Sequence, residues 1–261
     1  MSHPPSHLTK SPGTSLAADL FCSDLDGTLL GDTAATARFK AAWEALAPAR
    51  RPILVYNSGR LVDDQRSFVD DGTLPVADHF IGGVGTQLVG GDDRRVDPDW
   101  QAELAHGWDR GRVHEIAAAI RGIAPQPDQA QNEFKSSWHL HDAAPEVLRV
   151  LERELSRADL RAAVVYSSGR DLDVIPRAAT KGGALGWLCA RLGIDTGRVI
   201  VAGDTGNDVQ MFQLPRARGI VVGNALPELE NAVRHKLTHF SPHSCADGVI
   251  DGLRHFGVLP A

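Results

Sequence analysis

Two aspartates one residue apart follow a short apolar segment near the start of the chain. They are Asp24 and Asp26, in the stretch FCSDLDGTLLGD at residues 21–32. Carboxylates two positions apart on an extended backbone point the same way, so their charges repel each other. Folding gains nothing from this arrangement unless a cation or a reacting group lies between them. The pair therefore indicates a metal site or a site of covalent chemistry.

A second acidic cluster follows another apolar segment, much later in the chain. The sequence GDTGND gives Asp204, Asn207 and Asp208 directly after the residues VIVA. Magnesium prefers oxygen ligands, a few of them carboxylates and the rest water and substrate phosphate. Either cluster alone is also typical of a capped turn after a strand. The two clusters in the same context predict a magnesium site.

A hydroxyl and a cation complete the set of residues that could handle phosphate. Ser58 follows a third apolar segment in YNSGR, and Lys181 opens a helical pattern in ATKGGAL. A serine there is also typical of a helix N-cap. A lysine at a helix N-terminus opposes the helix dipole unless an anion lies nearby. Both residues are therefore candidates for contact with a phosphoryl group.

The elements that must position these residues are short apolar segments, each ending in Gly, Asp, Asn or Ser. Continuous runs of Val and Ile are typical of strands buried on both faces, as in a parallel sheet. Helical spacing recurs between them, for example at residues 181–193, where a glycine ends the pattern. Alternating strands and helices predict a doubly wound α/β fold with its site at the carboxyl ends of the strands. The expected strands lie at residues 20–24, 52–59, 79–83, 198–204 and 218–224.

The middle of the chain has a different pattern, and we expect it to form a separate α+β module. It contains helical patterns at 112–123 and 144–159, an extended segment at 135–142, and a hairpin at 161–176 around Ser167-Ser168-Gly169. The expected division is a disordered tail at 1–18, a catalytic core at 19–87 and 176–261, and an inserted cap domain at 88–175.

Composition limits the class of protein. The chain has 261 residues, 43% hydrophobic and 23% charged, with a net charge of −6. This balance is typical of a globular protein and argues against nucleic acid or an anionic membrane as a main partner. The three cysteines, which are far apart, give no zinc or disulfide spacing. No apolar run approaches the roughly 18 residues of a membrane helix, and no signal core precedes the fold. We therefore expect a cytoplasmic location.

The motifs resemble a known superfamily. DxDGT, a serine at a strand end, a lysine opening a helix and GDxxND, in this order, resemble the four motifs of the haloacid dehalogenase superfamily. The stretches DLDGTLLGD, GGVGTQL, DLDVIPRAATKGGAL, GDTGNDVQMF and ADGVIDGLRHFG resemble its sucrose-phosphate phosphatase group. The stretches NSGRLVDDQ, KSSWHLHDA and GIVVGNALPEL are similar to those of bacterial mannosylfructose-phosphate phosphatases. The similarity spans residues 19–258.

The resemblance implies a Rossmann-like core with an inserted cap, and it assigns catalytic roles. It makes Asp24 the nucleophile that forms an aspartyl-phosphate. Asp26 becomes the general acid that protonates the leaving sugar oxygen and later activates water. Ser58 donates to a phosphoryl oxygen, and Lys181 neutralises charge on the phosphate and on the nucleophile.

The resemblance also implies a magnesium ion. Its ligands would be Asp24, the backbone carbonyl of Asp26, and Asp204. Water molecules on the ion would be ordered by Asn207 and Asp208.

Residues of the cap are expected to recognise the sugar. The resemblance assigns sugar-binding positions to Gln131 and Lys135. The polar and aromatic stretch YSSGRDLD adds Tyr166, Ser168 and Asp173 as further candidates for substrate binding.

The expected activity is hydrolysis of a sugar phosphate, with mannosylfructose 6-phosphate or a related disaccharide phosphate as substrate. Sucrose-6-phosphate hydrolysis is kept as an alternative, and it is less favoured because plant sucrose-phosphate phosphatases often carry asparagine where Gly27 stands. A phosphomutase also stays open, since it would use the same nucleophile and acid, and so does an idle sugar-phosphate-binding sensor. A dehalogenase is disfavoured, because leaving halide needs no proton from Asp26. The expected partners are a small sugar phosphate and, functionally, a glycosyltransferase that produces it.

Overall fold

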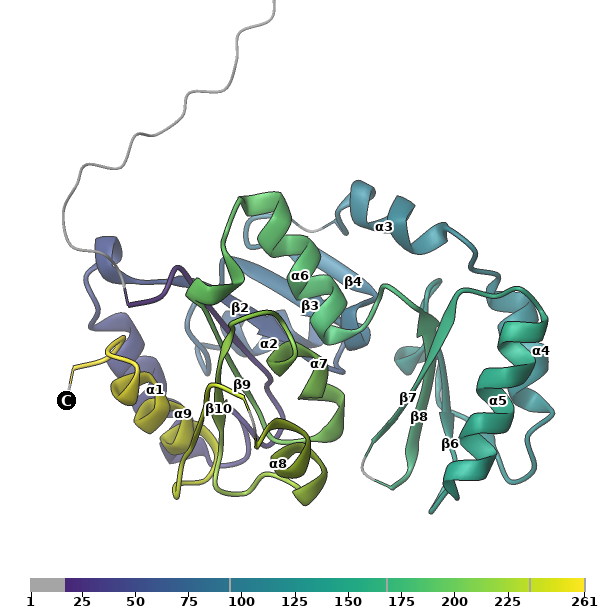
Figure 1. Ribbon diagram of the computed structural model, residues 1–261. Helices are drawn as coiled ribbons and strands as arrows, with labels where there is room; N and C mark the ends of the chain where they lie inside the picture. The colour runs from purple at the N-terminus through teal and green to yellow at the C-terminus, as the bar shows by residue number, and fades with distance from the viewer. Residues whose placement is uncertain (1–16, 94, 168, 235, 261) are drawn as a thin grey trace, which may run out of the picture.

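The larger of two sheets has seven strands and carries the expected core. The computed structural model (Figure 1) describes residues 17–93, 95–167, 169–234 and 236–260. The strand order is β11-β10-β9-β1-β2-β3-β4, and every neighbouring pair is parallel except β3–β4. The strands are β1 (Leu20–Ser23), β2 (Ile53–Asn57), β3 (His79–Gly82), β4 (Gln87–Gly90), β9 (Val199–Gly203), β10 (Arg218–Val221) and β11 (Thr238–Phe240).

Helices cover both faces of this sheet, which confirms the doubly wound fold. Successive residues of β1 point to opposite faces, so Phe21 joins one apolar cluster while Leu20 and Cys22 join another. The first cluster packs against α1 (Thr33–Glu44), α2 (Val62–Asp70) and α9 (Cys245–His255). The second packs against α3 (Pro98–Ala105), α6 (Lys181–Leu192), α7 (Val209–Phe212) and α8 (Pro227–Val233).

The smaller sheet has four antiparallel strands in the order β5-β6-β8-β7. Two helices cover the face turned away from the larger sheet and share a third apolar cluster with it (Figure 1). The predicted hairpin is confirmed, with Ser167 opposite Asp171, whereas Ser168 lies outside the described residues. The elements are β5 (Ala124–Pro125), β6 (Ser136–His139), β7 (Ala162–Ser167), β8 (Asp171–Pro176), α4 (Arg110–Ala118) and α5 (Pro145–Arg157).

Three expected boundaries differ from the structure, and one of them, between residues 175 and 176, falls within β8. The division expected between residues 87 and 88 falls within β4, whose residues pair with β3 in the larger sheet. Ala18, expected in a disordered tail, is fully buried in the first apolar cluster. Residues 1–16 lie outside the described part of the chain.

Short 3-10 turns link several elements, at Pro48–Arg50, Gly83–Gly85, Asp128–Ala130, Thr196–Arg198 and Gly206–Asp208. Among the helices in the described ranges, none has the length and apolar character needed to cross a membrane.

Candidate active site

The carboxyl ends of three adjacent strands bring the predicted core residues together. Strand β1 lies between β9 and β2 in the sheet. Asp24 follows β1, Ser58 follows β2, and Asp204 follows β9. Because these strands are parallel, their ends lie at one edge, and all three residues line the same cavity.

Lys181 is the central cation of this edge. Its Nζ lies 2.7 Å from Asp24 Oδ1 and 2.6 Å from Asp208 Oδ1. Lys181 and Asp208 are 0% exposed and Asp24 is 4% exposed, so the cluster is almost wholly buried and only Asp24 reaches the cavity. Helix α6 places the lysine in its first turn, where Thr180 caps the helix and Asn57 Nδ2 donates to the lysine carbonyl at 2.9 Å. The structure therefore gives Lys181 the anionic neighbours that its position at a helix start requires.

Asp208 fixes the loop that carries Asp204. Its Oδ2 accepts hydrogen bonds from the backbone N–H groups of Asp204, at 3.0 Å, and Thr205, at 3.1 Å. Its Oδ1 is held by Lys181, so protein groups engage both oxygens. Asn207 lines the cavity, and its Oδ1 accepts from the Thr205 hydroxyl. Of the two residues predicted to order metal-bound water, Asn207 is the one that faces open space.

The electrostatics of the cluster show an excess of negative charge. Burial raises the pKa of Asp24 well above its usual value, and the charges of Asp208 and Asp204 act in the same direction, against the lowering effect of Lys181. Burial and the Asp208 charge raise the pKa of Asp204 to about 6. Burial lowers the pKa of Lys181, but the two carboxylates outweigh it and leave that pKa above its usual value. One lysine therefore does not balance the carboxylates at this site.

The same cluster fits a divalent cation. One oxygen from each of Asp24, Asp204 and Asp208 lies within 4.8 Å of the others. Thr28 donates to Asp204 Oδ1 at 3.2 Å, which orients that carboxylate. Gly27, at a φ of +78°, leaves room for it, because a Cβ there would lie 2.1 Å from Asp204 Oδ2. Carboxylate oxygens in this number suit magnesium, with space left for water and phosphate.

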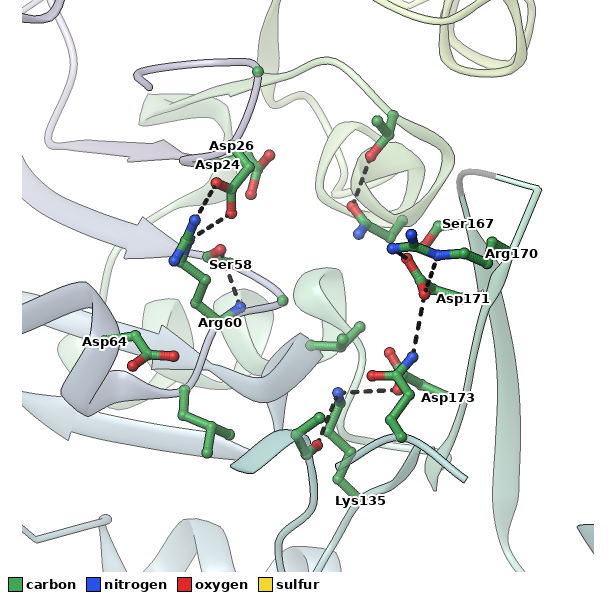
Figure 2. Close-up of a pocket in the computed structure, with 18 of the residues that line it drawn as sticks. Asp24, Asp26, Ser58, Arg60, Asp64, Lys135, Ser167, Arg170, Asp171 and Asp173 are labelled. Carbon is green, nitrogen blue, oxygen red and sulfur yellow. Dashed lines mark hydrogen bonds and ion pairs between the residues drawn. The ribbon is translucent and has the colours of Figure 1, made fainter. Parts of the chain in front are cut away.

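Asp26 lies apart from this buried group and lines the cavity from the side of the core. Both of its carboxylate oxygens are engaged by Arg60, with Nε–Oδ2 and Nη2–Oδ1 distances of 2.7 Å each. Ser58 is buried beside them, and its Oγ accepts from the Arg60 backbone N–H at 3.2 Å. Figure 2 shows dashed lines from the arginine to both of these predicted catalytic residues.

A cavity of about 640 Å³ separates the two sheets and is lined from both sides. The core contributes the acidic residues, Ser58 and Arg60, and the smaller sheet contributes a facing polar wall (Figure 2). The wall is built by alternation along the strands, which turns polar side chains to the cavity and apolar ones to the third cluster. Its polar members include Gln126, Gln129, Lys135, His139, Ser167, Arg170, Asp171 and Asp173.

Lys135 and Asp173, both predicted from the sequence, meet in this wall. Lys135 Nζ lies 2.9 Å from Asp173 Oδ1, and the Ser137 hydroxyl donates to the same carboxylate at 2.6 Å. The side chains are 6% and 11% exposed. The pair therefore presents few free donors or acceptors, and these are held in fixed positions.

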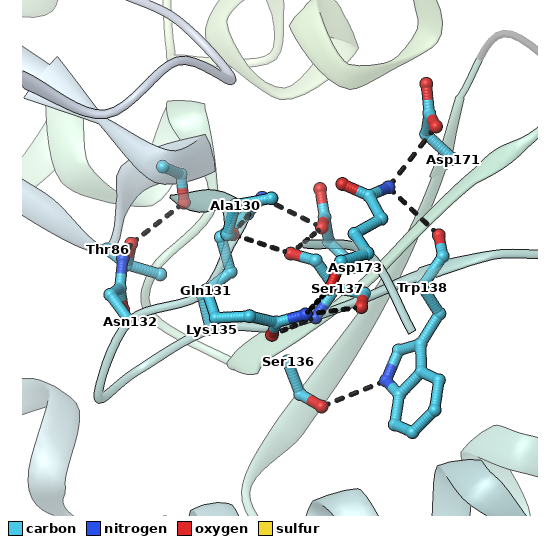
Figure 3. Close-up of polar contacts among 12 residues, drawn as sticks. Thr86, Ala130, Gln131, Asn132, Lys135, Ser136, Ser137, Trp138, Asp171 and Asp173 are labelled. Carbon is cyan, nitrogen blue, oxygen red and sulfur yellow. Dashed lines mark hydrogen bonds and ion pairs between the residues drawn. The ribbon is translucent and has the colours of Figure 1, made fainter. Parts of the chain in front are cut away.

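Gln131 supports the wall from behind it. Its Nε2 donates to the carbonyls of Gln126, at 3.1 Å, and Ser137, at 2.7 Å, while its Oε1 accepts from the Ser137 N–H at 2.8 Å (Figure 3). Through these bonds the Gln131 side chain holds the segment 126–130 in place, and residues of that segment line the cavity. The structure does not bring Gln131 itself to the cavity lining.

The structure does not bring Tyr166 to the cavity either. It occupies the opposite face of β7, packed against the third apolar cluster. Its hydroxyl donates to the Leu140 carbonyl at 2.8 Å and accepts from the Ala143 N–H at 3.0 Å. Alternation explains the difference, because Ser167, the next residue, is the one that lines the cavity. Ser168 lies outside the described residues.

Several lining residues had no role predicted from the sequence. The period of two along β8 was a usable signal for Asp171, since it shares a face with Asp173. Arg60 follows Ser58 by two residues, but a loop has no periodicity from which its direction could be predicted. His139 and Arg170 reach the cavity through the antiparallel pairing of β6 with β8 and the β7–β8 turn.

The fold and the site together define a hydrolase of the haloacid dehalogenase class. The sequence profile of the family described as sucrose-6F-phosphate phosphohydrolase matches residues 17–257, and the chain belongs to this family of phosphoric monoester hydrolases. The mannosylfructose-phosphate phosphatase of Agrobacterium fabrum is 46% identical over 242 residues, which are 92% of this chain and 98% of that protein.

Two further similarities support the same family. Sucrose-phosphatase 1 of Nicotiana tabacum is 30% identical over 260 residues, and the match covers 95% of this chain but 61% of the plant protein. The sucrose-phosphatase of Synechocystis sp. PCC6803, solved in complex with sucrose and phosphate, superposes with a TM-score of 0.83 at 29% identity. That match covers 91% of this chain and 97% of the solved one.

Proposed function

We propose that the chain is a magnesium-dependent sugar-phosphate phosphatase that acts through an aspartyl-phosphate on Asp24, with mannosylfructose 6-phosphate as its substrate. The observation that carries the proposal is the position of Asp24 in the cavity, where Lys181 holds one of its oxygens at 2.7 Å. The 46% identity to a mannosylfructose-phosphate phosphatase over nearly its whole length supports the choice of sugar.

Asp24 performs the covalent step. Its carboxylate attacks phosphorus, an O–P bond forms, and the bond from phosphorus to the sugar oxygen breaks. Lys181 keeps one Asp24 oxygen oriented and offsets charge as it develops. Magnesium, when bound by Asp24, Asp204 and the Asp26 carbonyl, supplies further charge compensation for the phosphoryl oxygens.

Asp26 handles the proton. It donates a proton to the departing sugar oxygen, and its carboxylate then accepts one from the water that hydrolyses the aspartyl-phosphate. Ser58 lies on the same loop as Arg60, and its Oγ accepts a hydrogen bond from the Arg60 N–H. The hydroxyl hydrogen therefore remains available to donate to a phosphoryl oxygen.

We assign the smaller sheet and its helices, residues 110–176, to the role of a cap. The cavity lies between the sheets, so the cap wall limits water around the reacting phosphate and contacts the sugar. A volume of about 640 Å³ is in the range of small-molecule sites and accommodates a disaccharide phosphate. Lys135 and Asp173 are the residues that we assign to the sugar.

Sucrose 6-phosphate is the second candidate substrate. The solved Synechocystis sucrose-phosphatase, which holds sucrose and phosphate, has the same fold over 91% of this chain. Membership of a phosphohydrolase family favours hydrolysis over the phosphomutase and the idle sensor.

A panel of phosphate esters tests the proposal. Phosphate release is measured from mannosylfructose 6-phosphate, sucrose 6-phosphate, glucose 6-phosphate and p-nitrophenyl phosphate, with MgCl₂ or with EDTA. We expect the highest kcat/KM for mannosylfructose 6-phosphate and loss of release in EDTA. Isomerisation without release would identify a mutase. Equal release in EDTA would exclude the magnesium mechanism, and no turnover of any ester would favour the sensor.

A further inference from the structure

The lysine and arginine side chains that line the cavity are already paired with carboxylates. Within the described residues they form the pairs Arg60–Asp26, Lys135–Asp173 and Arg170–Asp171. Lys181, which is fully buried on the core side and does not line the cavity, is shared by Asp24 and Asp208. An incoming phosphate dianion therefore meets cations that are already engaged, and it must share or displace a carboxylate to gain one.

The Arg60–Asp26 pair is the one suited to exchange. It lies beside the nucleophile loop, and its side chains are 38% and 54% exposed, compared with 6% and 11% for Lys135 and Asp173. An exposed ion pair contributes little net stability, because water screens it and replaces its bonds. Opening this pair is therefore much less unfavourable than opening the buried one.

Hydrogen bonds hold the backbone of Arg60 in place, so the side chain extends from a fixed position. Its N–H donates to Ser58 Oγ, and its carbonyl accepts from the Gly83 N–H at 2.8 Å and from Gln65 Nε2 at 3.1 Å. The side chain crosses the Phe68 ring at 5.2 Å. The guanidinium can therefore change partners by side-chain rotation alone, within reach of the loop that holds Asp24 and Asp26.

We propose that Arg60 exchanges partners during the reaction. In the empty site it holds both Asp26 oxygens, and in the filled site it binds the phosphoryl group and releases Asp26 toward the sugar oxygen. A guanidinium fork fits phosphate oxygens as well as it fits a carboxylate, and the dianion carries more charge. This inference rests on the proposed function, because it gives Arg60 a part in binding the ester that Asp24 attacks.

Binding of inorganic phosphate distinguishes an Arg60 that moves from Asp26 to phosphate from an Arg60 that only holds Asp26. Its dissociation constant is measured by titration calorimetry in MgCl₂ for the wild type, Arg60→Gln and Arg60→Lys. We expect Arg60→Gln to weaken phosphate binding about tenfold, the loss of a charge-assisted contact. We expect Arg60→Lys to weaken it less, because the charge remains. Unchanged phosphate affinity in a folded Arg60→Gln variant would overturn the exchange.

Arg38→Gln is the matched control. Arg38 forms a similar two-point contact with Asp247, at 2.9 and 2.6 Å, on an exposed surface that does not line the cavity. Its removal is expected to leave phosphate affinity unchanged. An equal loss in both variants would indicate a general effect of surface charge and would overturn the specific role of Arg60.

Asp26→Asn gives an independent measurement. Asparagine cannot hold the guanidinium as an ion pair, so Arg60 is free for phosphate, and we expect tighter phosphate binding. The gain should disappear in the double variant Arg60→Gln, Asp26→Asn. A gain that persists in the double variant would arise from lost repulsion alone and would contradict the exchange. Failure of the proposed function is distinct, because it would appear as a wild type that binds phosphate but hydrolyses no ester.

Discussion

The core side of the cavity, which we call the floor, and the facing wall of the cap use charged residues in two different ways. On the floor, Asp24, Asp208 and Lys181 are almost wholly buried, and one cation serves two carboxylates. On the wall, Lys135 and Arg170 each have a carboxylate partner of their own. The floor is therefore left with an excess of negative charge that suits a metal cation. The wall is balanced and presents polar groups of the kind that bind hydroxyls.

This difference separates chemistry from recognition. Parallel strand ends fix the floor, because their backbone positions are set by packing on both faces of the sheet. The wall depends on alternation in antiparallel strands, so single substitutions there can change the contacts with a sugar and leave the floor intact. Substitutions in the two regions should accordingly affect different kinetic parameters.

The largest expected effect is that of Asp24→Asn. An amide does not attack phosphorus, so we expect kcat to fall by at least about 10³-fold for every ester. The fold should survive, because Lys181 keeps Asp208 as a partner. Circular dichroism and phosphate release measure the two properties together. Near-normal turnover in a folded variant would refute the assignment of the nucleophile.

Lys181→Met should affect stability as well as activity. It leaves buried carboxylates without their cation, and breaking such a pair costs about 3–5 kcal/mol. Urea unfolding in metal-free buffer measures the loss. Lys40→Met is the control, since Lys40 forms an exposed pair with Glu44 and its removal should cost no more than about 0.5 kcal/mol. Equal losses in both variants would mean that the floor is not electrostatically distinct.

Lys135→Ala is expected to act on recognition. Loss of a charged contact to the sugar should raise KM for the sugar phosphate about tenfold, with little change for p-nitrophenyl phosphate, which lacks the sugar. Steady-state kinetics on both esters test this. Arg112→Gln, on an exposed pair with Glu115 in α4, is the control. Equal changes in KM for both esters would remove Lys135 from the sugar site.

Tyr166→Phe should have the smallest effect. The hydroxyl bonds to Leu140 and Ala143 on the face away from the cavity, so its loss should lower the free energy of unfolding by about 1 kcal/mol. KM for the sugar phosphate should not change. A marked rise in KM without loss of stability would return Tyr166 to the list of substrate contacts.

The fold was largely predictable, because its signals are local and strong. The five apolar segments formed strands β1, β2, β3, β9 and β10, and the helix at 181–193 ends as predicted, with Gly193 at a φ of +68°. The antiparallel strand β4 was missed, since GGVGTQL turns the chain back through Val84 at a φ of +60°. Gly83 and Gly85 on either side also have positive φ, of +57° and +97°, so these glycines indicated a turn but not the strand that follows it.

The candidate site also contains residues that were predictable from the sequence and residues that were not. Asp24, Ser58, Lys181 and Asp204 were predictable, because strand ends and a helix start determine where they meet. The partner of Asp26 was not, since the direction of Arg60 depends on loop contacts with Gly83 and Gln65. Tyr166 and Ser167 differ by a single step along β7, and composition alone could not tell which of them faces the cavity.

A phosphoenzyme measurement tests the central claim most directly. The wild type is mixed with mannosylfructose 6-phosphate and MgCl₂, quenched in acid within milliseconds, digested and analysed by mass spectrometry. We predict one added phosphoryl group on Asp24, labile to hydroxylamine and absent from Asp24→Asn. A phosphoryl group on another residue, or phosphate release with no labelled enzyme at any time, would contradict the account.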